Sequence, residues 1–140
     1  MIKITKETSV SIDDVLHLYQ AVGWTNYTNQ PQMLEQSLAH SLAIYVARDG
    51  EEIVGLVRLV GDGFSSVFVQ DLIVLPSYQR QGIGSALMKE ALGDFKDAYQ
   101  VQLATEQTEK TLEFYRSLGF ETLSTYDCTG MIWVNRKKFK

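Results

Sequence analysis

The sequence contains one cysteine, Cys128, and this scarcity excludes an intrachain disulfide. A lone thiol is typical of a reducing compartment, so we expect a cytoplasmic protein. Long apolar runs are missing too, since the longest, Leu42 to Ala47, is far too short to cross a bilayer. No secretory or transit segment is visible, because the first residues already alternate like a strand. We therefore expect no membrane association.

Basic residues are fewer than acidic ones. The 140 residues carry 13 Lys and Arg against 17 Asp and Glu, which gives a net charge of −4. An acidic balance argues against nucleic acid as a partner and mildly favours a cationic substrate. The sequence also lacks repeats, low-complexity tracts and linkers. We therefore expect a single domain over residues 1–140, long enough to bury a hydrophobic core.

One stretch, residues 66–92, predicts a strand, a loop rich in backbone donors, and a helix. Its first part is rich in β-branched and aliphatic residues, which favours a buried strand. Pro76 then ends the strand because it lacks a backbone donor. Gly82 and Gly84 precede a run of good helix formers. The first turn of a helix has unpaired N–H groups and a partial positive charge, so the ligand predicted for this loop is an anion, above all a phosphate.

Two common phosphate loops do not match this one. A P-loop requires a lysine after its last glycine, but Ser85 follows Gly84 directly, and a dinucleotide-binding fingerprint requires a third glycine where Leu87 stands. The segment Gln79-Arg80-Gln81-Gly82-Ile83-Gly84 instead resembles the Gln/Arg-x-x-Gly-x-Gly/Ala loop of the GNAT acetyltransferases, which holds the pyrophosphate of acetyl-CoA. A second segment, Glu113 to Phe120, resembles the Phe-Tyr-x-x-x-Gly-Phe motif of the same family.

The resemblance implies the GNAT fold. This is a single α/β (α+β) domain whose mixed, mostly antiparallel seven-stranded sheet is flanked by about four helices and splays after the fourth strand. Hydrophobic periodicity and turn signals place such elements along nearly the whole chain. Strands are expected near residues 2–4, 42–48, 53–60, 66–74, 101–104, 120–124 and 131–134, and helices near 11–22, 29–40, 85–92 and 108–117.

The same resemblance implies an acetyl-CoA-dependent N-acetyltransferase. It would pass the acetyl group to a primary amine of a small molecule or peptide by direct attack, without a covalent enzyme intermediate. Tyr115 stands where the family has a tyrosine beside the thioester sulfur, and a phenol there can protonate the departing thiolate. Tyr115 could alternatively be only a core residue of an amphipathic helix. For the whole chain, the alternative is a non-catalytic acyl-CoA-binding or regulatory module.

Asp71 is the second catalytic candidate, because the segment Val69 to Val74 resembles the Glu-Asp-hydrophobic strand of several family members. An alkyl amine with a pKa of about 10.4 must lose a proton before it attacks. Asp71 could take that proton, or it could be a structural carboxylate held by backbone donors. Gln70 stands in the position of the family's Glu, cannot act as a base, and is expected to orient substrate or water.

The remaining site residues are also implied by the resemblance. Backbone N–H groups of Leu72, Ile73 and Val74 are expected to serve the pantetheine arm and, if the strand bulges there, the tetrahedral oxyanion. The acceptor side is expected to include Trp24, Tyr27 and Gln70, although the two aromatic rings could instead pack in the core. No metal is expected, and a monomer and a homodimer are equally compatible with the sequence. The residues expected to hold the pyrophosphate are Gln79, Arg80, Gln81, Gly82, Ile83, Gly84 and Ser85.

Overall fold

A computed structural model of the chain describes residues 1–137. The chain forms two compact units, Met1–Leu103 and Ala104–Lys140. The first unit contains a sheet with helices on both faces, and the second contains one α-helix and a 3₁₀ turn. The predicted mixed α/β class is therefore confirmed.

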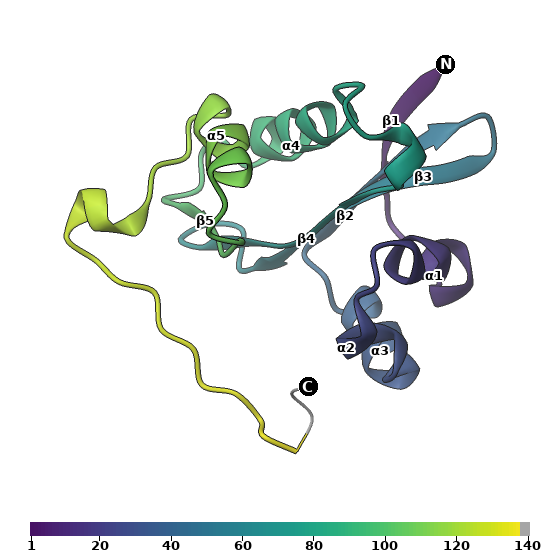
Figure 1. Cartoon of the computed structure of the whole chain (residues 1–140), viewed down its shortest axis with the longest axis horizontal. Helices are drawn as coiled ribbons and strands as arrows, with labels where there is room; N and C mark the ends of the chain where they lie inside the picture. Colours follow the sequence, from purple (N-terminus) through teal and green to yellow (C-terminus); the bar gives the residue numbers. More distant parts are fainter. Residues whose placement is uncertain (138–140) are drawn as a thin grey trace. The chain divides into compact units, whose positions relative to one another are not determined.

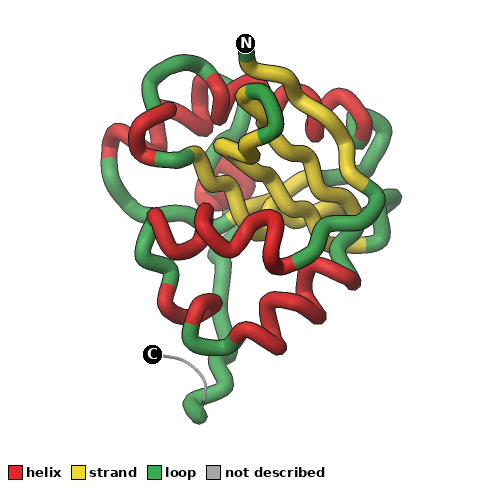
Figure 2. Tube along the Cα trace, turned by 90° about the vertical axis from the view of Figure 1, so that its right-hand side faces the viewer, coloured by secondary structure: helices red, strands yellow, loops and turns green. Residues whose placement is uncertain are grey.

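The first unit is organised around a five-stranded sheet (Figure 2). Its strands lie in the order of the chain, and each neighbouring pair is antiparallel except the last, β4 and β5, which is parallel. This confirms a mixed, mostly antiparallel sheet. The strands are β1 (Ile2–Glu7), β2 (Ala43–Asp49), β3 (Glu52–Gly61), β4 (Val67–Val74) and β5 (Val101–Leu103).

Helices cover both faces of this sheet (Figure 1). On one face lie α1 (Ile12–Ala21), α2 (Thr25–Thr28) and α3 (Pro31–Ala39), and on the other lies α4 (Ile83–Asp94). A 3₁₀ turn, η1 (Pro76–Tyr78), leads from β4 towards α4. The short α2 lies outside the helices expected from the sequence. It forms because the N–H groups of Thr28 and Asn29 donate to the carbonyls of Trp24 and Thr25, which closes one helical turn.

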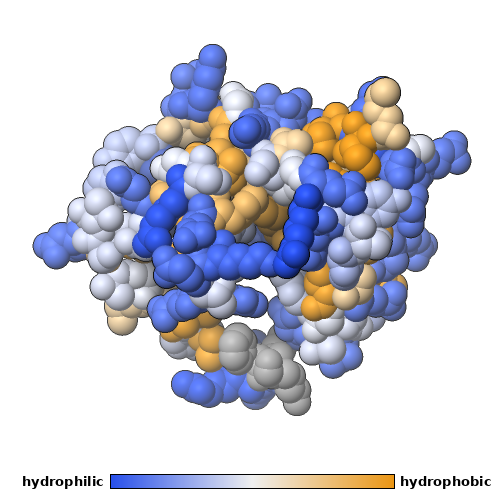
Figure 3. All heavy atoms as spheres, turned by 45° about the horizontal axis from the view of Figure 1, so that its top comes forward, coloured by the Kyte–Doolittle hydropathy of each residue, from blue (hydrophilic) through white to orange (hydrophobic). Residues whose placement is uncertain are grey.

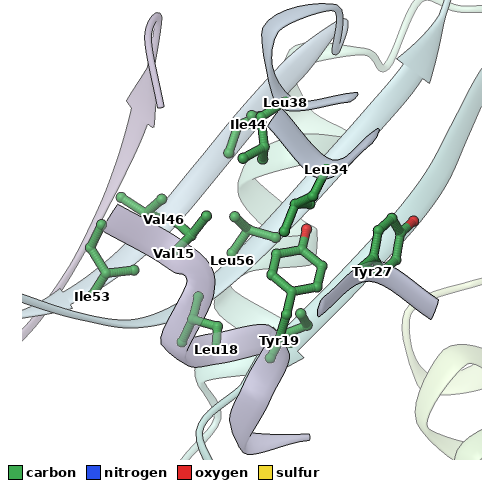
Figure 4. Close-up of a cluster of buried hydrophobic side chains, with 11 residues drawn as sticks. Val15, Leu18, Tyr19, Tyr27, Leu34, Leu38, Ile44, Val46, Ile53 and Leu56 are labelled. Atoms are coloured by element: carbon green, nitrogen blue, oxygen red, sulfur yellow. The ribbon is translucent and has the colours of Figure 1, made fainter. Parts of the chain in front are cut away.

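The main hydrophobic core lies between the sheet and the first three helices (Figure 4). From α1 it receives Val15, Leu18 and Tyr19, which recur at helical spacing and so share one face. Ser11 begins this helix as predicted, since its N–H donates to the Asp14 carboxylate at 3.4 Å. The other buried members of the core are Tyr27, Leu34, Leu38, Ile44, Val46, Ile53, Leu56 and Ile73.

The second unit contains α5 (Glu109–Ser117) and a 3₁₀ turn, η2 (Leu123–Tyr126). Thr108 begins α5, because its Oγ1 accepts the N–H of Thr111 at 3.2 Å. The helix predicted at 108–117 is thus confirmed.

The strands expected at 120–124 and 131–134 are wrong, since the sheet within residues 1–137 has five strands rather than seven. Aromatic and β-branched residues favoured strands in both places, but a strand forms only beside a neighbour that pairs with its backbone. The backbone bonds of this region are local instead. Phe120 N–H donates to the Tyr115 carbonyl at the end of α5, and Cys128 N–H donates to the Leu123 carbonyl.

The face seen in Figure 3 is mostly hydrophilic, with several small apolar patches between polar side chains. Among residues 1–137, none of the helices has the length and hydrophobicity needed to cross a bilayer. In the first unit the large apolar side chains that stay exposed include Phe64 and Tyr99, and scattered exposure of this kind is ordinary for a folded surface.

Candidate active site

The loop that joins η1 to α4 turns sharply. Gly82, the residue before α4, has φ of 80°, a region that suits glycine because a Cβ would be strained there. Arg80 has φ of 65°, which is uncommon for a residue with a Cβ. Non-glycine residues with a left-handed backbone conformation cluster at functional sites. The predicted phosphate loop is therefore a defined bend with strained backbone at its centre.

The N-terminus of α4 presents free backbone donors. The first helical hydrogen bond is donated by Ala86 N–H to the Gly82 carbonyl at 3.0 Å. The N–H groups of Ile83, Gly84 and Ser85 therefore have no acceptor within the helix. No side chain within residues 1–137 caps this end. These donors and the helix dipole attract an anion, and the exposed Arg80 adds a guanidinium to them. Such a donor set suits a diphosphate.

Two side chains fasten the start of this loop to the sheet. Tyr78 Oη donates to Asp49 Oδ2 at 2.6 Å, a bond that lowers the pKa of Asp49 and raises that of Tyr78. Gln79 Nε2 donates to the Val74 carbonyl at 3.0 Å. The Gln79 side chain is therefore bonded to the end of β4, while its backbone belongs to the loop.

Gly55 of β3 allows α4 to approach the sheet closely. An ideal Cβ on Gly55 would lie 3.1 Å from the Ile73 carbonyl oxygen, 3.2 Å from Leu87 Cδ1 and 3.4 Å from Ile83 Cγ2. These distances are tighter than ordinary van der Waals contact, so a side chain would displace the first turns of α4. Gly55 thus allows α4, whose first turn carries the free N–H donors, to lie close to the sheet.

Among the described residues of the first unit, the edge of β4 that faces β5 has no strand partner over most of its length, and we call it the open edge. The pairing with β5 covers only Val67 to Val69, so the strand continues beyond its neighbour. In an antiparallel ladder the N–H groups point alternately to the two sides. Because Leu75 N–H donates to Val54 of β3, the N–H groups of Leu72 and Val74 face the open edge. Ile73 faces β3 instead, and its side chain lies in the core.

A β-bulge stands beside this open edge, at Gln70. Leu59 pairs with Val69 and Arg58 pairs with Asp71, so Gln70 is an extra residue of β4 without a partner on β3. The sequence placed a possible bulge among residues 72–74, but those residues pair regularly with β3. The bulge lies just before them. It turns Asp71 to the opposite face of the sheet from Val69, although the two are only two residues apart.

Asp71 is a buried carboxylate surrounded by donors. Only 2% of the residue is exposed, and its oxygens accept bonds from Arg58 Nε at 2.7 Å, Tyr19 Oη at 2.8 Å and Tyr27 Oη at 3.0 Å. Burial raises the pKa of Tyr19 and of Tyr27, and the Asp71 charge raises both further. Burial lowers the pKa of Arg58, but the Asp71 carboxylate outweighs it and the net shift is upward. The four side chains form one charge-balanced cluster, which we call the Asp71 cluster.

The residues expected on the acceptor side divide into two groups. Tyr27 is buried, and its hydroxyl both donates to Asp71 and accepts from Arg58 Nη2 at 3.0 Å. Trp24 is half-buried against the core, with its ring 6.1 Å from that of Tyr19. Gln70 is exposed at the bulge. Of the three, Gln70 is the residue most accessible to a ligand, whereas Tyr27 is a member of the Asp71 cluster.

Sequence reasoning missed Arg58, Tyr19 and Gly55. One signal for Arg58 was available, because a single arginine interrupts the apolar run of β3 and a buried charge requires a partner. Tyr19 lies at helical spacing on the buried face of α1, where an ordinary core residue is expected. Its bond to Asp71 joins residues 52 apart in the chain, a relation that periodicity does not reveal.

Tyr115 lies in the last turn of α5, in the second unit. Its ring is half-buried, with centroid distances of 5.0 Å to Phe114 and 5.9 Å to Phe120. Burial raises the pKa of the Tyr115 hydroxyl, and a hydrogen bond with Thr105 opposes that shift. Tyr115 therefore keeps its proton at neutral pH, as a general acid must.

The comparison of sequences decides the family. A sequence profile described as an acetyltransferase (GNAT) domain matches residues 40–122. The chain belongs to the GNAT acetyltransferase family. It is also 27% identical, over 94% of its length, to GCN5-related N-acetyltransferase 1, chloroplastic, of Arabidopsis thaliana. The chain spans 57–66% of the length of the first plant relatives that it matches.

Solved structures agree with this assignment. A GNAT family acetyltransferase from Streptococcus pneumoniae TIGR4 is 76% identical, with a TM-score of 0.90 over 97% of this chain and 99% of that one. The PaiA N-acetyltransferase of Thermoplasma acidophilum, solved in complex with coenzyme A, is 18% identical with a TM-score of 0.66 over 85% and 90% of the two chains. That second likeness extends to the fold alone. The GNAT fold predicted from the two motifs is thereby confirmed.

Proposed function

We propose that this protein is an acetyl-CoA-dependent N-acetyltransferase that acetylates a primary amine of a small molecule or peptide. The observation that carries the proposal is the uncapped start of α4, where the N–H groups of Ile83, Gly84 and Ser85 follow the Arg80 guanidinium. Backbone donors at a helix N-terminus and a nearby arginine suit the pyrophosphate of CoA. Membership of the GNAT family and a CoA-bound structural neighbour support the same cosubstrate.

The open edge of β4 would receive the pantetheine arm. Its amide groups can pair with the N–H groups of Leu72 and Val74 as an added strand would. This leaves the thioester towards the Gln70 bulge, where backbone groups are released from the ladder and can stabilise an oxyanion.

The reaction is a direct acyl transfer. The amine nitrogen forms a bond to the thioester carbonyl carbon, and the carbon–sulfur bond then breaks. Tyr115 gives its proton to the departing thiolate and recovers one from solvent. The amine loses one proton before it attacks and a second as the amide forms. One of these balances the proton that Tyr115 recovers, so the products are an N-acetyl amide, free CoA and one proton.

The amine proton goes to water in this proposal. Asp71 was one candidate to accept it, but its oxygens already take bonds from Arg58, Tyr19 and Tyr27 inside the protein. A carboxylate so occupied favours a structural role for Asp71, although its donors are side chains and not the backbone groups that the sequence suggested.

A non-catalytic acyl-CoA-binding module is the second candidate. The observation that favours it is Gln70, an amide at the bulge where related enzymes were expected to have a carboxylate. Such a module would bind CoA and release none from acetyl-CoA. The cytoplasmic location and the choice between monomer and homodimer stay predictions from the sequence.

A pair of glycine variants tests the proposal. Gly82→Glu places a carboxylate against the diphosphate and should weaken CoA binding at least about tenfold in titration calorimetry. Gly50→Glu is the matched control, because Gly50 also has positive φ and open space around it but lies in the β2–β3 hairpin. Equal binding by the two variants would refute the loop assignment. CoA release from acetyl-CoA with a panel of amines then separates the enzyme from the binding module.

A further inference from the structure

Arg58 lies at the point where the register of the β3–β4 pairing shifts. It faces Asp71 across the β3–β4 ladder at the last regular pair before the Gln70 bulge. Both side chains are almost wholly buried, with 4% and 2% exposed, and their atoms Nε and Oδ2 lie 2.7 Å apart. This buried ion pair between the two strands therefore lies directly beside the irregularity.

Without the bulge, β3 and β4 could pair in two regular registers, and both would place a side chain on the wrong face of the sheet. If the pairing of Leu59 with Val69 continued without a bulge, Asp71 would stand opposite Val57, on the apolar face covered by α4. A carboxylate buried there without a partner is strongly disfavoured. If the pairing of Arg58 with Asp71 continued instead, Val69 would turn away from that face. The bulge places Val69 on the face covered by α4 and Asp71 on the opposite face, beside Arg58.

The register is anchored to all three helices of the same face. Tyr19 of α1 and Tyr27 of α2 donate to the Asp71 carboxylate. Arg58 Nη1 reaches the Ser37 carbonyl at 3.4 Å and Ser41 Oγ at 3.3 Å, at the end of α3. The bulge is thus held by buried, satisfied bonds.

We propose that Arg58 is a positioning residue for acetyl transfer. It acts through Asp71, which adjoins Gln70, and so sets where the main chain of the bulge lies along the open edge of β4. This inference rests on the proposed function, which places the thioester at that edge. Because Arg58 is buried, its effect reaches the reacting groups through the strand and not by contact with them.

The test combines kinetics with a direct measurement of register. Arg58→Met removes the charge, Arg58→Lys keeps it, and Asp71→Asn provides a second way to weaken the pair if Arg58→Met does not fold. Arg48→Met is the control, because Arg48 pairs with Glu7 at 3.1 Å across β2 and β1, away from β4. Each variant is assayed for kcat and for KM of acetyl-CoA. NMR contacts between the backbones of residues 58 and 71, and of residues 59 and 69, report the register.

In Arg58→Met we expect the contact between residues 58 and 71 to be lost and kcat to fall about 10–100-fold. We expect KM for acetyl-CoA to stay within about twofold, because the α4 loop is untouched. Arg58→Lys should regain the contact and most of kcat, Asp71→Asn should fall between the two, and Arg48→Met should change neither. An intact register in the folded Arg58→Met or Asp71→Asn protein, or an altered register with unchanged kcat, would overturn the proposal. A wild-type protein that releases no CoA would overturn the proposed function instead, and the NMR contacts would still decide the role of Arg58 in the register.

Discussion

Gly55 of β3 and Leu87 of α4 are in such close contact that a single added methyl group on Gly55 would lie 3.2 Å from Leu87 Cδ1. The carbonyl oxygen of Ile73 bounds the same space at 3.1 Å and belongs to the backbone, so it yields less easily than a side chain. The position of α4, and with it the position of its free N–H groups, therefore depends on a strand residue that has no side chain.

The substitution Gly55→Ala should weaken CoA binding although Gly55 lies inside the sheet. The added methyl group forces α4 to shift, and overpacking of this kind costs about 1–3 kcal/mol. We expect a lower melting temperature and a higher Kd for CoA, measured by thermal denaturation and calorimetry. Gly93→Ala is the control, because Gly93 lies in the same helix with nothing within 4 Å of an added Cβ. There alanine should stabilise the helix by about 0.5–1 kcal/mol. Equal effects of the two substitutions would contradict the close-packing argument.

Arg80 combines a charge with a strained backbone, and two variants separate the contributions. Arg80→Gln removes only the charge, whereas Arg80→Gly also relieves the positive φ of 65°. Both should bind acetyl-CoA about tenfold more weakly at low salt, because one charge-assisted contact to phosphate is lost. Arg80→Gly should nevertheless be the more stable of the two by up to about 1 kcal/mol. Lys89→Gln, which removes an exposed cation farther along α4, should leave the affinity unchanged. A similar loss of acetyl-CoA affinity in Lys89→Gln would show that the overall positive charge of this region, and not the position of Arg80 in the loop, governs binding.

Tyr78→Phe should loosen the predicted phosphate loop without changing the N–H donors of α4. The Tyr78 hydroxyl is bonded to Asp49 of β2, and that bond lowers the pKa of the Asp49 carboxyl. The link is therefore complete above the ordinary Asp pKa of about 3.9 and is lost as pH falls through the lowered value. At pH 7 the variant should bind CoA severalfold more weakly, and Tyr99→Phe, at an exposed tyrosine, should not. Identical affinities for wild type and Tyr78→Phe would remove the loop-fastening role.

The sequence was sufficient for those features that depend on local pattern. The apolar runs of β2 and β3 around Asp49-Gly50, the amphipathic face of α1 and the glycines before α4 each predict their own element from neighbouring residues. The bend before α4 was predictable for the same reason, because a helix start and its glycines lie within one short segment. Residues 120–124 and 131–134 show the limit of this reasoning, since strand propensity does not provide a strand with a neighbour.

The Asp71 cluster lay beyond such reasoning because its members are far apart in the chain. Tyr19, Tyr27, Arg58 and Asp71 come from four elements, and only the folded sheet and helices bring their polar atoms together. The bulge that turns Asp71 towards Arg58 breaks the period of two on which strand prediction depends. Sequence patterns indicated Asp71 as a candidate, but its bonding partners follow from tertiary structure.

Tyr27→Phe tests the cluster through stability. The variant leaves Asp71 with one donor fewer, and a buried polar group that loses a partner costs about 1–3 kcal/mol. In the wild type, burial raises the folded-state pKa of Tyr27 above the unfolded value of about 10. Its contribution is therefore complete below pH 10 and is lost as pH rises through the raised value. Denaturant unfolding should show a less stable variant at pH 7 whose stability falls less steeply above pH 10. A variant as stable as wild type at pH 7 would mean that the hydroxyl contributes nothing.

Tyr115→Phe tests the proposed acid. The substitution removes the hydroxyl and keeps the ring contacts with Phe114 and Phe120, so α5 should stay folded. Loss of a general acid typically lowers the rate about 10²–10⁴-fold, and we expect kcat to fall in this range while the Kd of acetyl-CoA stays within about twofold. Because burial raises the pKa of Tyr115 above its ordinary value near 10, kcat of the wild type should hold up to about pH 10 and decline only above it. Tyr126→Phe, at an exposed tyrosine of the same unit, is the control and should leave kcat unchanged. An unchanged kcat for Tyr115→Phe over a panel of amines would exclude the acid role, whereas a matching loss of acetyl-CoA affinity would assign Tyr115 to binding.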